Sequence, residues 1–316
     1  FNTIEIDESR GILKKTSLNK EKFINEINWY LKLPSKLQYL IPRIYKYSTS
    51  MIKPYVEMEC YGYNTLHELF LYGKLPLYKW QIIFEKLLFI IKDMSRFIVD
   101  SPVEAMAAMR DIYITKTLSR LELMKNSQDF QLFFEKTIMI NGKNYHSLSY
   151  YMKILPEIIE RKLLSGFDTK FNIIHGDLCF SNILLEENHG FMRIIDPRGE
   201  FGSFDIYGDP RYEMAKLLHS IEGKYDFIIE DMFKLEKDGT SLTFTIPQKT
   251  DDLLKVFCDV FTTELQAYSK IRLIESLLFL SMIPLHSDNT LRQHAMLATG
   301  IMLLENVLEE KNDAGK

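Results

Sequence analysis

Two short β-like runs of apolar and polar residues open the chain, at residues 1–6 and 11–16. The turn-forming residues between them predict that the runs pair as a hairpin. In the next stretch the apolar positions recur at helical spacing after Asn19, a suitable N-cap. These positions are Phe23, Ile27, Tyr30 and Leu31. Two more β-like runs, 41–50 and 53–62, complete a predicted small sheet with one helix.

After Gly62 the pattern becomes mainly helical. Apolar residues at helical spacing predict helices over residues 65–73, 77–98, 101–126, 147–166 and most of 249–310. A short hairpin is expected at residues 137–145, because Asn141 and Gly142 suit a type I′ turn. Residues 1–60 therefore predict a β-rich lobe, and residues 61–316 a large helical lobe in which a few strands are embedded. The expected fold class is α+β.

Composition narrows the class of protein. The chain has 316 residues, of which 46% are hydrophobic, enough for a large core in a two-lobed unit. A net charge of -4 gives no electrostatic footprint for nucleic acid or for an anionic membrane surface. Three scattered cysteines favour a reducing, cytoplasmic setting (Cys60, Cys179 and Cys258).

The ends of the chain and its apolar runs bear on targeting. No signal peptide is recognised, and the longest apolar run, 273–285, is too short to span a bilayer. The run is instead expected to form a buried helix. Because the first residue is Phe, the sequence is expected to be a trimmed chain or part of a longer polypeptide.

Candidate chemistry is concentrated in the segment NIIHGDLCFSNILL, residues 172–185. Apolar runs on both sides predict strands, so the polar residues between them form a loop held at both ends. His175, Asp177 and Asn182 match the spacing H-x-D-x-x-x-x-N of phosphoryl-transfer loops. A carboxylate such as Asp177 can orient or deprotonate an acceptor hydroxyl, and the amide oxygen of Asn182 suits Mg²⁺. The alternative is that these residues only close a turn.

A second carboxylate lies where such a metal site needs one. The run MRIIDPRG predicts a strand that ends at Asp196, followed by the turn residues Pro197 and Gly199. The intervening segment, residues 186–190, returns the chain as a hairpin, which brings Asn182 and Asp196 near each other. This combination favours phosphoryl transfer over a simple turn.

With these motifs the chain resembles the aminoglycoside phosphotransferase and choline kinase family of small-molecule kinases. Members of that family have a two-lobed, protein-kinase-like fold. The resemblance implies that Asp177 is the catalytic base, that Asn182 and Asp196 hold magnesium, and that His175 braces the loop. Cys179, within the loop, is expected to serve packing.

The same resemblance implies a nucleotide site in the small lobe. A strand lysine for the phosphates would be Lys14 or Lys15, which face opposite sides of the strand, and Glu26 would be its helix partner. Lys15 is favoured because Thr16 and Ser17 follow it. Backbone groups of residues 57–61, including Glu57 and Glu59, would bind the adenine of ATP or of another nucleoside triphosphate.

The acceptor is expected to be small. Only about a dozen residues separate Asp196 from the helix that begins near Pro210, which leaves little platform for a peptide substrate. The helical segments would instead enclose a sugar, a polyol or an amino alcohol. Arg198, His286 and Asp288 are candidate substrate contacts, although each also fits a turn or surface role.

Two features leave alternatives open. No G-x-G-x-x-G precedes Lys15, which favours a nucleotide-binding pseudokinase that acts as a partner domain. The DPRG run also resembles the kinase-like half of bacterial bifunctional proteins whose other half is a nucleotidyltransferase. That likeness implies a fused or adjacent nucleotidyltransferase upstream and a link to surface-polysaccharide or capsule assembly.

Asp209, before Pro210, is expected to cap the next helix rather than to take part in chemistry.

Overall fold

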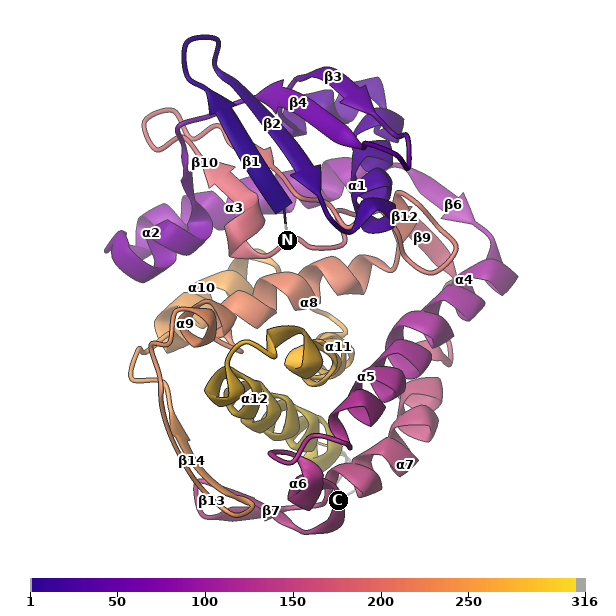
Figure 1. Cartoon of the computed structure of the whole chain (residues 1–316), viewed down its shortest axis with the longest axis vertical. Helices are drawn as coiled ribbons and strands as arrows, with labels where there is room; N and C mark the ends of the chain where they lie inside the picture. The colour runs from indigo at the N-terminus through magenta and orange to yellow at the C-terminus, as the bar shows by residue number, and fades with distance from the viewer. Residues whose placement is uncertain (1, 311–316) are drawn as a thin grey trace. The chain divides into compact units, whose positions relative to one another are not determined.

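A computed structural model describes residues 2–310. This part of the chain divides into two compact units, the first made of residues 2–101 and 170–216 and the second of residues 102–169 and 217–310. The ribbon in Figure 1 traces both units along the chain.

The first unit begins with an antiparallel sheet in the order β1-β2-β4-β3. Its strands are β1 (Asn2–Asp7), β2 (Ile12–Ser17), β3 (Ile44–Ser48) and β4 (Tyr55–Glu59). The pairing of β1 with β2 confirms the expected hairpin. Val56 and Met58 alternate along β4 as buried residues, so one face of the sheet belongs to the core.

Helix α1 (Lys20–Lys32) follows β2 and packs against it, as Figure 1 shows. The side chain of Asn19 accepts a hydrogen bond from the Lys22 amide at 3.2 Å, which confirms the predicted N-cap. The α1 face that carries Phe23, Ile27 and Tyr30 is buried. The short 3₁₀ helix η1 (Ser35–Leu40) then leads into β3.

Two small sheets and two helices make up most of the rest of this unit. One sheet has the order β11-β10-β5 and the other β12-β9-β6. The elements are β5 (Asn64–Thr65), α2 (Leu66–Tyr72), α3 (Leu77–Ser95), β6 (Ile98–Asp100), β9 (Lys170–Ile173), η4 (Phe180–Asn182), β10 (Ile183–Leu185), β11 (Met192–Ile194) and β12 (Tyr207–Gly208). Helix α8 (Pro210–Ile221) starts here, and its last residues belong to the second unit. The antiparallel pairing of β10 with β11 confirms the hairpin expected between Asn182 and Asp196.

The second unit is mainly helical. Its elements are α4 (Pro102–Arg110), the π-helical turn η2 (Asp111–Thr115), α5 (Lys116–Met124), α6 (Gln131–Glu135), β7 (Ile138–Ile140), β8 (Lys143–Tyr145), α7 (Leu148–Ile159), the π-helical turn η3 (Glu160–Leu164), α9 (Tyr225–Ile229), β13 (Lys234–Asp238), β14 (Ser241–Thr245), α10 (Asp251–Val260), α11 (Tyr268–Met282), η5 (Ile283–His286) and α12 (Thr290–Glu309). Helices α11 and α12 pack side by side and are buried along most of their length. The expected hairpin forms between β7 and β8, with positive φ at Asn141 and Gly142.

One hairpin was not anticipated from the sequence. Strands β13 and β14 pair with each other, and β14 also pairs in parallel with β7, about a hundred residues earlier. Each strand offers few apolar residues, so its local pattern is weak, and its stability depends on that distant partner. Within residues 2–310, no helix combines the length and the apolar character that crossing a membrane requires.

Candidate phosphotransfer site

A buried lysine links the first sheet to the segment that follows β11. Lys15, in β2, is 2% exposed, and its Nζ donates hydrogen bonds to Glu26 Oε1 and to Asp196 Oδ1, each at 2.8 Å. Its neighbour Lys14 is half-buried and lies over the ring of Tyr55 instead. Strand alternation thus sends Lys15 to the carboxylates and Lys14 to the other face.

The electrostatics of this cluster keep Lys15 charged. Burial alone would lower the pKa of Lys15, but the carboxylates of Glu26 and Asp196 outweigh burial and raise the pKa above its usual value. A fixed ammonium group of this kind can bind the phosphate oxygens of a nucleotide.

Asp196 is held in an unusual backbone conformation. Its φ is +57°, a region that residues other than glycine seldom adopt, and it precedes Pro197, which further restricts its backbone. The Asp196 amide donates to the hydroxyl of Tyr30 in α1 at 2.9 Å. Strained backbone that is held by surrounding contacts is common at functional sites.

His175 is fully buried and fixed at both ring nitrogens. Nε2 lies 2.8 Å from the carbonyl oxygen of Ile195, which can only accept, so Nε2 carries the proton. Nδ1 accepts from the Asp177 amide at 3.3 Å. Burial lowers the pKa of His175 to about 4, against smaller opposing effects of nearby acidic groups. The ring is therefore a neutral brace between the loop and the residue that follows β11.

Glu213, in α8, grips the backbone of the loop. Its two carboxylate oxygens accept from the amides of His175 and Gly176, at 3.0 and 2.7 Å. Gly176 has a φ of +76°, which lets both amides point at one carboxylate. Burial raises the pKa of Glu213 to about 7, although these two hydrogen bonds lower it in part.

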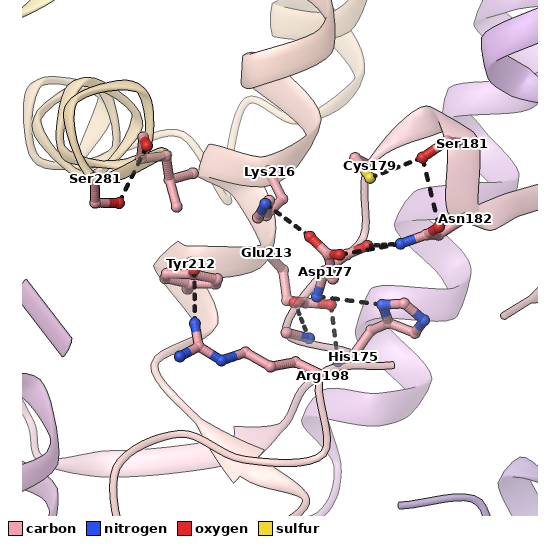
Figure 2. Close-up of polar contacts among 12 residues, drawn as sticks. His175, Asp177, Cys179, Ser181, Asn182, Arg198, Tyr212, Glu213, Lys216 and Ser281 are labelled. Carbon is pink, nitrogen blue, oxygen red and sulfur yellow. Dashed lines mark hydrogen bonds and ion pairs between the residues drawn. The ribbon is translucent and has the colours of Figure 1, made fainter. Parts of the chain in front are cut away.

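The carboxylate of Asp177 lies between two donors, as Figure 2 shows. Lys216 Nζ lies 2.7 Å from Oδ1, and Asn182 Nδ2 donates to Oδ2 at 3.3 Å. Burial alone would raise the pKa of Asp177, but the Lys216 ammonium outweighs burial and lowers the pKa to about 2. Asp177 is thus a fixed anion whose side chain is still 39% exposed.

Asn182 and Asp196 fit a magnesium ion by chemistry and by backbone placement. The Ile195 amide donates to the Asn182 carbonyl at 3.0 Å. Asn182 and Asp196, which follows Ile195, therefore lie at the same end of the β10–β11 hairpin. Asn182 Nδ2 donates to the Asp177 carbonyl at 2.8 Å. The amide oxygen, which accepts a long hydrogen bond from the Ser181 hydroxyl at 3.4 Å, is the atom suited to a cation. Mg²⁺ typically takes one or two protein oxygens and completes its shell with waters and substrate phosphates, so this pair is sufficient.

The turn after Asp196 ties these parts together. The Arg198 amide donates to the His175 carbonyl at 2.9 Å, and its guanidinium donates to the Tyr212 hydroxyl at 3.0 Å. Gly199 has a φ of +73°, and a Cβ there would lie 2.2 Å from the backbone of Asn25 in α1. Arg198 therefore has a clear role in holding the turn, while a substrate contact through it stays a prediction.

The remaining expected residues lie elsewhere. In β4 and the segment after it, the amides of Glu59 and Cys60 donate to the carbonyls of Arg43 and Gly11 at 2.9 Å, so a bound adenine would have to use other backbone groups there. Glu57 pairs with Lys14 across the sheet. The expected adenine contacts of residues 57–61 stay a prediction.

His286 and Asp288 belong to the second unit, where His286 ends η5 and Asp288 follows it. Asp288 forms an ion pair with Arg292 at 3.6 Å, and the ring of His286 lies edge-on to Tyr225. Their expected contact with substrate stays a prediction. Asp209 accepts from the Arg211 amide at 2.9 Å, which confirms that it caps α8.

Three residues of the site were not singled out from the sequence for these contacts: Tyr30, Glu213 and Lys216. Glu213 and Lys216 are three residues apart in α8, so they share a helix face, and both are buried. The sequence did carry a signal for them, since these two charged residues lie among the apolar residues Met214, Ala215 and Leu217. Charged side chains are seldom buried unless they have partners, so a charged pair on a buried helix indicates specific contacts.

At the level of sequence, neither a protein-family model nor a curated protein matches the chain. Several solved structures match its fold. Plasmodium vivax ethanolamine kinase is 11% identical, with a TM-score of 0.51 over 97% of this chain and 78% of that one. An aminoglycoside phosphotransferase of type APH(2″)-IIa, bound to gentamicin, is 16% identical, with a TM-score of 0.54 over 93% of this chain and 84% of that one.

A GDP complex of a mutant aminoglycoside 2′-phosphotransferase-IIIa is also 16% identical, with a TM-score of 0.52 over 100% of this chain and 93% of that one. These likenesses confirm the α+β, protein-kinase-like fold that the sequence resemblance implied, with a small antiparallel sheet and a large helical part. At such low identity the likeness establishes the fold alone.

Proposed function

We propose that this protein is a kinase that transfers the γ-phosphoryl group of ATP, or of another nucleoside triphosphate, to the hydroxyl of a small molecule. One observation carries the proposal: Lys15, Glu26 and Asp196 meet in one cluster, in the same compact unit as the Asp177–Asn182 loop. Phosphoryl transfer needs a cation for the phosphates, oxygen ligands for a metal and a carboxylate at the acceptor, and this unit supplies each of them.

In the reaction, the acceptor oxygen forms a bond to the γ-phosphorus while the bond from that phosphorus to the β–γ bridging oxygen breaks. The electron pair of the broken bond leaves with the nucleoside diphosphate. The hydroxyl proton passes to Asp177. Because the Lys216 ammonium makes the Asp177 carboxylate a weak base, we assign Asp177 first to orienting the hydroxyl and to accepting its proton late in the transfer.

The other residues hold the nucleotide. Lys15 would bind the phosphates, with Glu26 fixing the ammonium group. Asn182 and Asp196 would hold Mg²⁺, which when bound neutralises charge on the phosphate oxygens. Tyr30 and His175 hold the segment just after β11 in place, through the Asp196 amide and the Ile195 carbonyl.

The class of acceptor follows from the short segment after Asp196. The chain enters α8 at Pro210, so it lacks a long segment on which a peptide could lie. The ethanolamine kinase and the gentamicin-bound phosphotransferase that share this fold support an amino alcohol or a sugar as acceptor. A cytoplasmic location is proposed from the three scattered cysteines. An upstream nucleotidyltransferase and a role in surface-polysaccharide assembly are proposed from the sequence resemblance.

One observation favours a second candidate, a nucleotide-binding pseudokinase. Asp7 ends β1, and Glu8, Arg10 and Gly11 lie in the turn between β1 and β2, where kinases of this fold often have several glycines. Two acidic side chains near bound phosphates would weaken binding or change the mode of binding.

Nucleotide turnover separates the two candidates. We expect the purified chain to bind ATP in the presence of Mg²⁺ and to release ADP faster when a hydroxylated acceptor from a panel of sugars, polyols and amino alcohols is added. Asp177→Asn should bind ATP but lose about 100-fold or more of this turnover. Binding without turnover for any acceptor would favour the pseudokinase, and no binding of any nucleoside triphosphate would refute both.

A further inference from the structure

Asp177 and Lys216 form an ion pair in which Lys216 Nζ lies 2.7 Å from Asp177 Oδ1. Lys216 is 8% exposed and comes from the second turn of α8, outside the loop that carries Asp177. The loop itself, residues 177–182, has the sequence DLCFSN and contains no cation. The positive charge at Asp177 is therefore supplied from a separate helix, as Figure 2 shows.

The same helix face holds the loop in two ways. Glu213 binds the backbone amides of His175 and Gly176, and Lys216, one turn later, binds the side chain of Asp177. The first two turns of α8 thus fix both the path of the loop and the orientation of its carboxylate. A residue three positions away on a helix is on the same face, so one rigid element sets both contacts.

The carboxylate keeps room for a substrate. A carboxylate has about four acceptor positions on its two oxygens. Lys216 occupies one position on Oδ1, and Asn182 lies against Oδ2. With 39% of the Asp177 side chain exposed, a further donor such as a hydroxyl can still reach it. An ion pair that served packing alone would not need to leave its anion this accessible.

The positive charge of Lys216 also reduces the repulsion between Asp177 and the phosphates of a nucleotide. A nucleoside triphosphate carries several negative charges, and a bare carboxylate beside the γ-phosphate would repel it. An ammonium group 2.7 Å from Asp177 cancels that repulsion locally. The acceptor hydroxyl and the phosphoryl group can then approach the same carboxylate.

We propose that Lys216 is a positioning residue for phosphoryl transfer, which fixes and neutralises the Asp177 carboxylate so that it can orient the acceptor hydroxyl toward the γ-phosphate. The inference rests on the proposed kinase function and deepens it. It assigns to α8 a side chain that acts through Asp177 rather than on the nucleotide.

The test is a double-mutant cycle on ATP turnover, with Lys216→Met, Asp177→Asn and the pair together. Met keeps the length of the side chain and removes its charge, and Lys216→Arg keeps the charge. The matched control is Lys79→Met, at an exposed position in α3 of the same unit. Each variant is assayed for ADP formation with Mg²⁺ at saturating ATP, with water and with the best acceptor, and for ATP affinity by calorimetry.

We expect Lys216→Met to lower kcat by about 100-fold, the scale of a misplaced reacting group. ATP affinity should fall by less than about tenfold, because the repulsion between the exposed Asp177 carboxylate and the phosphates is then no longer cancelled. Lys216→Arg should recover part of this loss, and Lys79→Met should behave as wild type. Because Lys216 acts through Asp177, the double variant should be no slower than Asp177→Asn alone.

Three results would overturn the proposal: wild-type kcat in Lys216→Met, multiplied losses in the double variant, or a loss confined to ATP affinity. Thermal unfolding and circular dichroism check the fold of each variant. If Lys216→Met does not fold, Lys216→Gln replaces it in the cycle, and if that also unfolds, the ion pair is a stability element and the proposal fails. A wild-type chain that never releases ADP would instead refute the kinase function itself, and with it the role of Lys216.

Discussion

Lys15 and Asp196 are 181 positions apart in the sequence, yet Lys15 Nζ and Asp196 Oδ1 lie 2.8 Å apart. The contact joins the second strand of the chain to the turn after β11. Glu26 completes it from α1, so three elements meet at one buried ammonium group. A nucleotide would bring its phosphates to this point, where the cation is already held in place.

The two neighbouring lysines provide a matched comparison. Lys15→Met should weaken ATP binding and lower kcat/KM by about 100-fold, because it removes the ammonium group at the phosphates. Lys14→Met should leave both nearly unchanged, since Lys14 lies over Tyr55. Calorimetry with ATP and Mg²⁺, together with steady-state kinetics, measures the difference. Equal losses in the two variants would contradict the assignment of Lys15.

The raised pKa of Glu213 predicts that the free energy of unfolding depends on pH. Its folded-state pKa is raised from 4.5 to about 7, so the folded protein binds the proton more tightly than the unfolded chain does. This contribution to stability is therefore present below pH 4.5 and is lost as pH rises toward 7. The loss amounts to about 3 kcal/mol for a shift of this size.

The variant Glu213→Gln cannot titrate at this position. The free energy of unfolding of wild type minus that of Glu213→Gln should therefore fall by about 3 kcal/mol between pH 4.5 and pH 7. Urea unfolding of wild type and of Glu213→Gln at several pH values measures the two free energies. The Gln side chain can accept only one of the two backbone hydrogen bonds. This loss changes the difference in free energy of unfolding by the same amount at every pH, so the dependence of the difference on pH is unaffected. A difference that stays flat over this range would show that Glu213 is ionised in the folded protein as it is in the unfolded chain.

Gly199 is predicted to be intolerant of a side chain. It shares a positive φ with Gly11, but a Cβ at Gly199 would overlap the Asn25 backbone, whereas Gly11 has open space around it. Gly11→Ala should lower the free energy of unfolding by about 1 kcal/mol through backbone strain alone. Gly199→Ala should lower it by about 3 kcal/mol, because the contact between α1 and the turn must also open.

Chemical denaturation of the two variants measures this comparison. ATP turnover adds a second readout, because the Gly199 turn follows Asp196 directly. The Gly199→Ala variant should lose turnover, while Gly11→Ala should keep it. Similar stabilities for the two variants would mean that α1 and the turn can separate without penalty.

Local sequence patterns predicted much of this fold and its central residues. The spacing of His175, Asp177 and Asn182 depends on one loop between two strands, and the position of Asp196 depends on the next strand. These are short-range relationships, which periodicity and turn residues encode well. The β1–β2 and β7–β8 hairpins and the Asn19 cap were predicted for the same reason.

The parts that the sequence did not reveal depend on long-range packing. Lys216 meets Asp177, and Tyr30 meets Asp196, only after separate elements dock. Alternation showed that Lys14 and Lys15 face opposite ways, but the burial of Lys15 against Glu26 decides which of them faces the carboxylates. Strand β14 is likewise defined by its distant partner β7.

In the proposed kinase, Asp196 holds the metal of the phosphotransfer site together with Asn182. The most direct test follows the γ-phosphoryl group of radiolabelled ATP into a small-molecule acceptor, with Mg²⁺, for wild type and Asp196→Ala. We predict labelled acceptor with wild type and a loss of about 1000-fold or more in the variant, because the charge on the phosphates is no longer neutralised. Its circular dichroism spectrum should match that of wild type. Transfer by a folded Asp196→Ala chain at close to the wild-type rate would contradict the account.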